Sequence, residues 1–297
     1  MCIRDRARIE HRAFNRPSFR KRGVKWASFH EYLNKKCSPD YAKDLMRYAK
    51  KYHRYLFKRD FSVLNNLSET KRNHVLCALS NLSKYLGIYG EFKKLVADYG
   101  LKWKQVNPEM LVLKRMAKTR ECGLVLEWAG KVKTKVPSLS LFLDFCFMSG
   151  LRVKEAIASW NLIRELYKAD RLGEYYNSKI EALEHFRFEE TFIRKHKRVL
   201  ITFMPEAFIC KVGSEGERVS WPLLHNRIAK KGLPLRFGDI REYWATFMTR
   251  YLTTAEIDFL QGRVGASIFM RNYFNPALIT DLKTRVFEGL AELQSRL

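Results

Sequence analysis

Apolar residues recur at helical spacing in the first third of the chain, and this period leaves few ways to bury them. In PDYAKDLMRYAKKYHRYLF (residues 39–57) they fall at Tyr41, Leu45, Tyr48, Tyr52 and Tyr55. Steps of three and four residues place side chains on one face of a helix. KRNHVLCALSNLSKYLGIYG (residues 71–90) repeats the pattern and reaches Gly87, a helix stop. Residues 28–105 are therefore predicted to form a helical bundle.

The charge of the chain is large and of one sign. Against 31 Asp and Glu there are 56 Lys and Arg, which gives a formal net charge of +25. Residues 1–106 hold 25 basic against 9 acidic residues, whereas the remainder holds 31 against 22. A polyanion relieves such self-repulsion, so nucleic acid is the expected partner and an anionic membrane surface the alternative. Residues 1–26 are expected to be a basic flexible tail.

The pattern changes after residue 102. In KWKQVNPEM (residues 102–110), Asn107-Pro108 favours a linker or a helix start. We therefore expect two domains, a helical DNA-binding domain over residues 27–105 and a second domain over residues 106–297. The second is predicted to be mainly α with a small β-hairpin or sheet.

Two segments of the second domain have distinct local patterns. SLSLFLDFCFMSGLRVKEAI (residues 138–157) predicts a buried helix, a turn at Ser149-Gly150 and a second helix that carries Arg152 in its first turn. HFRFEETFIRKHKRVLITFMP (residues 185–205) is rich in Phe, Ile, Val and Thr and predicts a two-stranded hairpin. The turn of this hairpin is expected at Lys195, His196 and Lys197.

Several classes of protein are disfavoured by the same sequence. The six cysteines are scattered without a C-x-x-C pair or zinc spacing, which is typical of a reduced cytoplasmic protein. The longest apolar run, residues 141–148, is too short to span a bilayer, and no apolar signal segment stands at the start. Glu189 and Glu190 are expected on opposite faces of a strand, which argues against a paired-carboxylate metal site.

One set of residues suits chemistry at a phosphodiester. Arg152, Arg241 and Arg263 offer guanidinium groups that form paired hydrogen bonds to phosphate oxygens and offset charge on a pentacovalent phosphorus. Tyr273 lies ten residues after Arg263, and a tyrosine phenolate can attack phosphorus and form a covalent intermediate. A lysine of the hairpin can protonate the leaving sugar oxygen. This chemistry needs neither a metal nor a nucleotide cofactor.

The combination resembles the tyrosine recombinase (phage-type integrase) family over most of the chain. GLRVKEA is similar to the family's first arginine motif, with Arg152 as the arginine and Glu155 at the supporting acidic position. RKHKRVLITFMP is similar to the lysine hairpin, with Lys197 as the first choice and Lys195 as the second. GDIREYWATF resembles the H-x-L-R motif and supplies Arg241. QGR at 261–263 stands where the family has L-G-H, and Tyr273 stands at the nucleophile.

The resemblance implies a fold and an activity. A helical core-binding domain and an α+β catalytic domain would clamp DNA, and four protomers would join two duplexes. The implied activity is site-specific recombination through a 3′-phosphotyrosine, with Tyr273 donated within its own protomer or to a neighbour. The protein would act in the cytoplasm, at the nucleoid.

Two departures narrow the resemblance. The family's histidines would fall at Gly238 and Arg263, and no histidine follows His225. Arginine in place of the second histidine, ten residues before the tyrosine, is most like the integrases of archaeal viruses and plasmids. Gly238 cannot accept a proton, so Asp239 or solvent would have to deprotonate the tyrosine.

Other interpretations stay open at this point. A catalytically degenerate integrase-like DNA-binding protein would explain the missing histidines, and a type IB topoisomerase-like relaxase would use the same chemistry. Tyr251 also lies ten residues after an arginine, but Tyr251 and Tyr243 are expected to pack inside a helical region. The C-terminal segment is expected to pack on its own domain or on a neighbour through an apolar face formed by Leu278, Leu282, Val286, Leu290 and Leu293.

Overall fold

The chain is mostly helical and divides into two compact units, Met1–Leu113 and Lys114–Leu297. The computed structural model describes residues 23–101, 109–110, 113, 122–194, 197–263 and 281–297. Within these residues, no helix is both long enough and apolar enough to cross a membrane.

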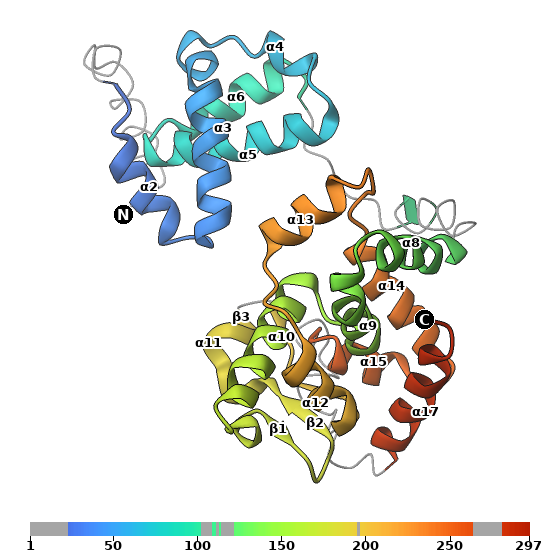
Figure 1. Ribbon diagram of the computed structural model, residues 1–297. Coiled ribbons are helices and arrows are strands. Elements are labelled where there is room, and N and C mark those ends of the chain that lie inside the picture. Colours follow the sequence, from blue (N-terminus) through green and yellow to red (C-terminus); the bar gives the residue numbers. More distant parts are fainter. Residues whose placement is uncertain (1–22, 102–108, 111–112, 114–121, 195–196, 264–280) are drawn as a thin grey trace. The chain divides into compact units, whose positions relative to one another are not determined.

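The first unit is a bundle of helices. In chain order they are α2 (Trp26–Asn34), α3 (Pro39–Lys58), α4 (Ser62–Asn65), α5 (Glu69–Tyr85) and α6 (Tyr89–Asp98). Helix α3 packs mainly against α5, and α2 and α6 also contact α5 (Figure 1). All five helices contribute apolar side chains to one core. The helices predicted within the described part of residues 28–105 are therefore present.

Helix α3 has the start and stop that its sequence favours. Pro39 occupies its first position, where no N–H is needed, and the chain leaves the helix at Arg59 with a φ of 57°. The buried face consists of Ala42, Leu45, Ala49, Tyr52 and Leu56. This face again steps by three and four residues, as expected for an amphipathic helix.

The face predicted for α3 was partly wrong. Tyr41 is exposed, and Tyr48 and Tyr55 are only half-buried. A tyrosine ring is apolar but its hydroxyl favours water, so these rings lie at the rim of the core. Arg47 lies 4.7 Å from the ring centre of Tyr48, and Arg54 lies 4.8 Å from that of Tyr55. The rim of α3 is therefore lined by cations stacked on aromatic rings.

The second unit is built around a central buried helix. Its helices are α8 (Cys122–Lys135), α9 (Ser140–Ser149), α10 (Val153–Lys168), α11 (Glu189–Phe192), α12 (Glu206–Glu215), α13 (Trp221–Ala229), α14 (Phe237–Met248), α15 (Thr254–Leu260) and α17 (Leu282–Gln294). Short 3-10 turns are η2 (Pro137–Leu139), η3 (Leu172–Glu174) and η4 (His185–Phe188). Helix α9 is apolar almost throughout and contacts α8, α10, α14 and α17.

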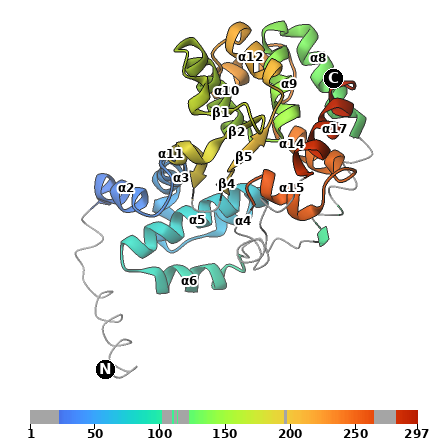
Figure 2. The ribbon, with the colours of Figure 1, turned by 90° about the horizontal axis from the view of Figure 1, so that it is seen from below.

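Two small antiparallel sheets complete this unit (Figure 2). One has the order β1 (Tyr176–Asn177), β2 (Ala182–Glu184) and β5 (Ile201–Phe203), with Leu183 opposite Thr202. The other pairs β3 (Ile193–Arg194) with β4 (Lys197–Arg198). The fold is thus mainly α with a small β component.

The hairpin predicted over residues 185–205 was too long. Residues 185–192 form η4 and α11, so Glu189 and Glu190 lie in a helix and the strand argument about them was wrong. Only β3 and β4 form the hairpin, and Lys197 opens β4 instead of lying in the turn. The Phe-rich composition that favoured a strand reflects burial, since Phe192 is fully buried.

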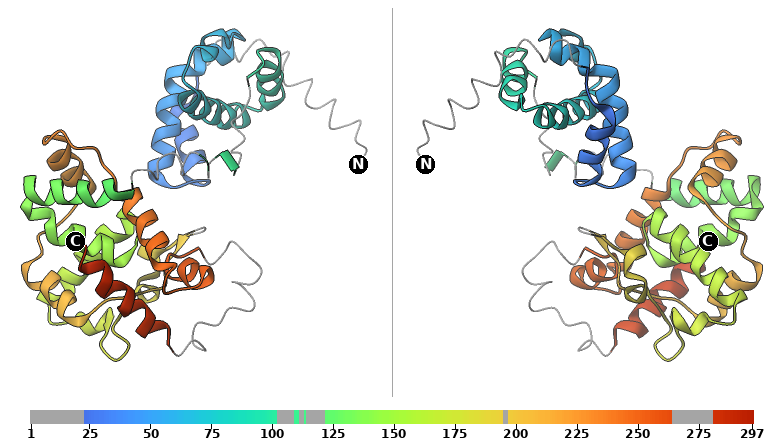
Figure 3. Two further views of the ribbon diagram at one scale, coloured as in Figure 1. Left: turned by 90° about the vertical axis from the view of Figure 1, so that its right-hand side faces the viewer. Right: turned by 90° about the vertical axis from the view of Figure 1, so that its left-hand side faces the viewer.

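The C-terminal helix packs on its own unit. Figure 3 shows α17 at the surface of the second unit, where it contacts α9, α14 and β5. Its predicted apolar positions Leu282, Val286, Leu290 and Leu293 are all buried there. Leu278 lies outside the described residues. The sequence left open whether this segment packs on its own domain or on a neighbour. In the structure, α17 packs on its own unit.

A chain of hydrogen bonds crosses the interior of the second unit. The ring nitrogens of His185 lie 2.6 Å from the Tyr175 hydroxyl and 2.8 Å from the Thr202 hydroxyl, and Tyr175 donates to Ser159 at 2.8 Å. All four side chains are buried. Because burial disfavours the charged imidazolium, the pKa of His185 is lowered to about 3 from its ordinary value of 6.5.

This histidine should make folding stability depend on pH. The unfolded chain takes up a proton below about pH 6.5 that folded His185 refuses, so stability is full above that pH and falls below it. The expected slope is up to about 1.4 kcal/mol per pH unit. Urea unfolding between about pH 7 and pH 5 should show this slope in the wild type and a shallower one in His185→Gln. Equal slopes in the two proteins would contradict the assignment.

Candidate active site

The turn that presents Arg152 is shaped by a glycine. Helix α9 ends at Ser149, and Gly150 follows with a φ of 59°, in the left-handed region. A Cβ on Gly150 would lie 2.4 Å from the ring of Trp244, so only glycine fits this close approach. The chain then enters α10, and Arg152 is its N-cap instead of a residue of its first turn.

Glu155 holds Arg152 from one turn inside α10. Its carboxylate accepts the Arg152 backbone N–H at 3.2 Å and the Nη1 at 3.0 Å. Glu155 is buried with 1% exposure, whereas the Arg152 side chain is 26% exposed. A buried carboxylate with a charged partner fixes the guanidinium in place. The acidic position expected from the sequence is therefore directly beside its arginine.

Arg241 reaches the same place from α14. Its Nη1 donates to the Gly150 carbonyl at 3.0 Å and its Nη2 to the Gln261 carbonyl at 2.6 Å. The Nη1 of Arg152 lies 3.5 Å from that same Gln261 carbonyl. The two arginines, 89 positions apart in sequence, thus share one main-chain acceptor. These two hydrogen bonds use only some of the N–H donors of the Arg241 guanidinium group.

Arg263 follows the end of α15. Gly262 adopts a φ of 65°, and the Arg263 backbone N–H donates back to the Asp258 carbonyl at 2.8 Å. This is the geometry of a glycine-terminated helix. The side chain is 44% exposed, and its Nη1 contacts the Asp258 carboxylate at 3.1 Å. Arg263 is therefore the exposed member of the arginine cluster that is formed by Arg152, Arg241 and Arg263.

The lysine hairpin docks on the same glycine. The Arg198 N–H donates to the Gly262 carbonyl at 3.3 Å, and a Cβ on Gly262 would lie 2.6 Å from the backbone nitrogen of Val199. Strand β4 therefore passes directly beside the turn that precedes Arg263. The backbone of Lys197 opens this strand, whereas its side chain, Lys195 and Tyr273 lie outside the described residues.

The arginines affect one another electrostatically. Burial, and after it the positive charges of Arg152 and Arg263, lower the pKa of the Arg241 guanidinium to about 9 from its ordinary value of 12.5. Glu155 and Asp258 oppose this shift. Arg241 stays charged at neutral pH, and its hydrogen bonds within the described residues go to backbone carbonyls. An anion placed among these side chains would relieve the repulsion.

Gly238 stands where the resembled family has its first histidine, and Asp239 follows it in sequence. Gly238 is exposed in the first turn of α14, and a Cβ there would meet nothing within 4 Å. Asp239 forms an ion pair with Arg236, with 2.7 Å between Oδ2 and Nε. The structure therefore gives Asp239 a partner other than the arginine cluster.

Two other tyrosines pack as the sequence predicted. The Tyr251 hydroxyl donates to Glu292 of α17, and its ring lies beside Phe247. Tyr243 packs against Phe147 and Phe247. Both tyrosines therefore connect helices of the second unit.

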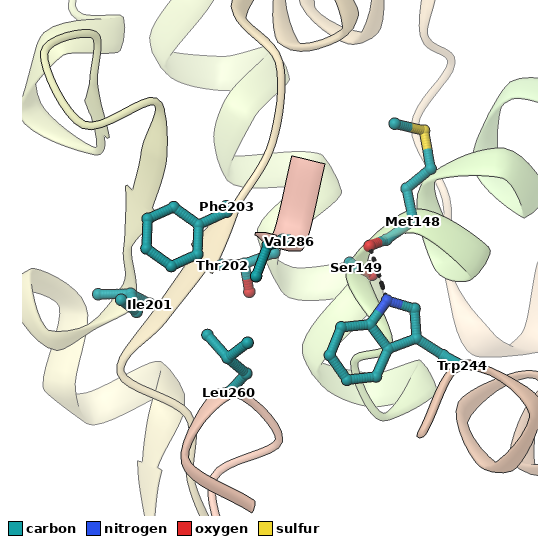
Figure 4. Close-up of a pocket in the computed structure, with 8 residues that line it drawn as sticks. All are labelled: Met148, Ser149, Ile201, Thr202, Phe203, Trp244, Leu260 and Val286. Atoms are coloured by element: carbon teal, nitrogen blue, oxygen red, sulfur yellow. Dashed lines mark hydrogen bonds between the residues drawn. The ribbon is translucent and has the colours of Figure 1, made fainter. Parts of the chain in front are cut away.

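Behind the cluster lies a small cavity lined by Met148, Ser149, Ile201, Thr202, Phe203, Trp244, Leu260 and Val286 (Figure 4). Its volume of about 10 Å³ is room for at most one water molecule. At one wall, the Trp244 indole N–H donates to the Met148 carbonyl at 3.1 Å. Among the described residues, no group of three or more His, Cys, Asp or Glu side chains is placed to hold a metal ion.

Sequence reasoning missed two residues of this site, Asp258 and Gln261. Gln261 is 1% exposed, and its Nε2 lies 3.1 Å from the Arg241 carbonyl and 3.5 Å from that of Gly150. Its Oε1 is buried without a hydrogen-bond partner among the described residues. The available signal was a polar residue where the resembled motif has leucine.

Comparison with known proteins identifies the family of the chain. A family model described as archaeal phage integrase matches residues 123–286, which is more than half of the chain. The chain therefore belongs to the archaeal phage integrase family. The matched segment includes Arg152, Arg241, Arg263 and Tyr273. No match was found among curated proteins or among solved structures.

Two glycine-to-alanine substitutions should have opposite effects on stability. Gly262→Ala places a Cβ at positive φ against the β4 backbone and should cost about 1–3 kcal/mol or more. Gly238→Ala adds a methyl in open space on a helix and should stabilise by about 0.4–1 kcal/mol. Urea unfolding of both variants measures the difference. A tolerated Gly262→Ala would show that the turn and the hairpin are not packed as described.

Proposed function

We propose that the chain is a site-specific DNA recombinase that cuts and rejoins DNA through a 3′-phosphotyrosine. Membership of the integrase family supports a role in DNA recombination. The observation that carries the chemistry is the convergence of Arg152 and Arg241 on the Gln261 carbonyl, with Arg263 two residues further along the chain and close enough for its charge to act on Arg241. Three guanidinium groups near one another suit one phosphate group.

In the proposed reaction, Tyr273 attacks the scissile phosphorus and its hydroxyl proton passes to solvent or to Asp239. The bond from phosphorus to the 5′ oxygen breaks, and Lys197 donates a proton to that oxygen, with Lys195 as the alternative donor. Arg152, Arg241 and Arg263 bind the non-bridging oxygens and offset the charge that develops there. The free 5′-hydroxyl of a partner strand then attacks the phosphotyrosine. The bond between phosphorus and the Tyr273 oxygen breaks, and the released Tyr273 oxygen regains a proton, so no metal or nucleotide is consumed.

DNA binding is assigned to both units. The helical residues 27–105 would act as the core-binding domain and residues 106–297 as the catalytic domain. Support for the first comes from the cations stacked on tyrosines along α3, since such side chains are available to phosphates. Recombination of two duplexes would bring four protomers together.

A second candidate is a DNA-binding protein of the same family that has lost its chemistry. The exposed Gly238 favours it, because nothing at that position can accept a proton. The Asp239–Arg236 ion pair favours this candidate as well, since the carboxylate next to Gly238 in sequence is already paired with an arginine. The covalent protein–DNA bond distinguishes the two candidates.

The covalent bond should depend on one tyrosine. Supercoiled plasmid is incubated with the protein and EDTA, the reaction is stopped with detergent, and protein-linked DNA is scored on a denaturing gel. The wild type and Tyr251→Phe should form the adduct and Tyr273→Phe should not, because only Tyr273 is the proposed nucleophile. Tyr251 is a matched control, since it also lies ten residues after an arginine.

Other results of this assay have definite meanings. An adduct lost only in Tyr251→Phe would mean that the nucleophile was assigned to the wrong tyrosine. Wild type that binds a plasmid carrying its recombination site without linking to it would favour the non-catalytic candidate.

Affinity for DNA should fall steeply with salt. If six or more phosphates are contacted, the binding constant should drop by roughly 10³ or more between about 50 mM and 200 mM salt, because bound phosphates release condensed counterions. Fluorescence anisotropy with labelled duplex at several salt concentrations gives the slope. An affinity that does not change with salt would contradict both candidates.

A further inference from the structure

We infer that Asp258 is a positioning residue for Arg263, and that this pair does the work for which the resembled family uses a histidine. The inference rests on the proposed function, because it assigns the orientation of an arginine that would bind the scissile phosphate. Asp258 belongs to α15 and Arg263 follows that helix, so their pairing depends on how α15 ends.

The pair is held by two contacts at once. The Arg263 Nη1 lies 3.1 Å from the Asp258 carboxylate, and the Arg263 N–H donates to the Asp258 carbonyl at 2.8 Å. Gly262 permits the second contact through its φ of 65°. The main chain and the side chain of Arg263 thus both bind Asp258 of α15.

Helix α15 itself is firmly anchored. At its start, the Thr253 N–H donates to the buried Glu256 carboxylate at 2.7 Å, and the Thr253 hydroxyl accepts the Glu256 N–H. Arg285 of α17 binds Glu256 with 2.5 Å between Nη2 and Oε1 and donates to the Tyr251 carbonyl at 2.8 Å. Asp258 therefore belongs to a helix that is held by Thr253 at its start and by Arg285 of α17.

An arginine in place of a histidine needs such a partner. The arginine side chain is long and has many rotamers, and a partly exposed one samples many of them unless a hydrogen bond selects among them. Arg152 has Glu155 for this purpose, and Arg241 has two backbone carbonyls. Asp258 supplies the equivalent contact for Arg263.

The contribution of Asp258 to folding should be small. The ion pair is part-exposed, with 44% and 28% of the two side chains accessible, and such pairs stabilise little. A purely structural role would therefore leave cleavage almost unchanged. A positioning role instead lowers the cleavage rate at saturating DNA, and does so only while Arg263 is present.

A double-mutant cycle tests this on the full chain. Rates of adduct formation are compared for wild type, Asp258→Ala, Arg263→His and the double variant. Asp258→Ala should slow the wild type by about tenfold or more but change the Arg263→His protein less than about twofold, since a histidine has no guanidinium to orient. If Arg263→His forms too little adduct to time, Arg263→Ala serves as the second background. Asp258→Glu should recover part of the rate.

Matched controls separate this inference from the proposed function. Glu174→Ala breaks the exposed ion pair with Arg171 on another element and should leave the rate unchanged. Equal slowing by Asp258→Ala in both backgrounds, a weakened DNA affinity that accounts for the loss, or no slowing at all would each overturn the role of Asp258. Absence of any adduct from wild type would instead contradict the proposed function.

Discussion

The candidate site depends on one backbone oxygen. The carbonyl of Gln261 accepts hydrogen bonds from Arg152 and Arg241 and thereby connects the turn after α9, the helix α14 and the end of α15. Guanidinium groups repel one another, so their approach requires an acceptor between them. A backbone carbonyl serves here without neutralising either group, which leaves positive charge for a bound anion. The remaining features of the site keep this oxygen in position.

Two glycines help to keep the Gln261 carbonyl in position. Because they lack a Cβ, their backbone lies closer to neighbouring atoms than other residues would allow. Gly150 lies against the Trp244 ring, and Gly262 lies against the backbone of β4. Both have positive φ, so each turn is also unfavourable for other residues. Trp244 and Arg241 both belong to α14, and therefore the packing of Gly150 and the hydrogen bond to its carbonyl fix the same helix. Close packing of the backbone therefore holds these parts of the site together.

Part of this could be predicted from sequence and part could not. Helical periodicity predicted the bundle and α17, and the Ser149-Gly150 turn was recognised because glycine marks a reversal. The extent of the hairpin was wrong, because aromatic residues near Phe192 are equally suited to a buried helical turn. Gln261 was missed since a carbonyl acceptor has no side-chain signature. Asp258 was missed because its pairing with Arg263 depends on the left-handed turn at Gly262, which brings together residues beyond the usual helical spacing.

The distribution of charge separates affinity from chemistry. Around the cluster, Glu155 pairs with Arg152 and Asp258 with Arg263, so among these residues the charge of Arg241 alone lacks a carboxylate. The excess positive charge of the chain lies mostly in residues 1–106 instead. Long-range attraction of a polyanion is then a property of the first part of the chain. The cluster, which keeps one positive charge without a carboxylate partner among these residues, adds little to that attraction, but under the proposed function its donors would favour a phosphorus centre whose negative charge increases during reaction. Under the proposed function, DNA would be held by the first unit, while the second would distinguish the transition state from the ground state.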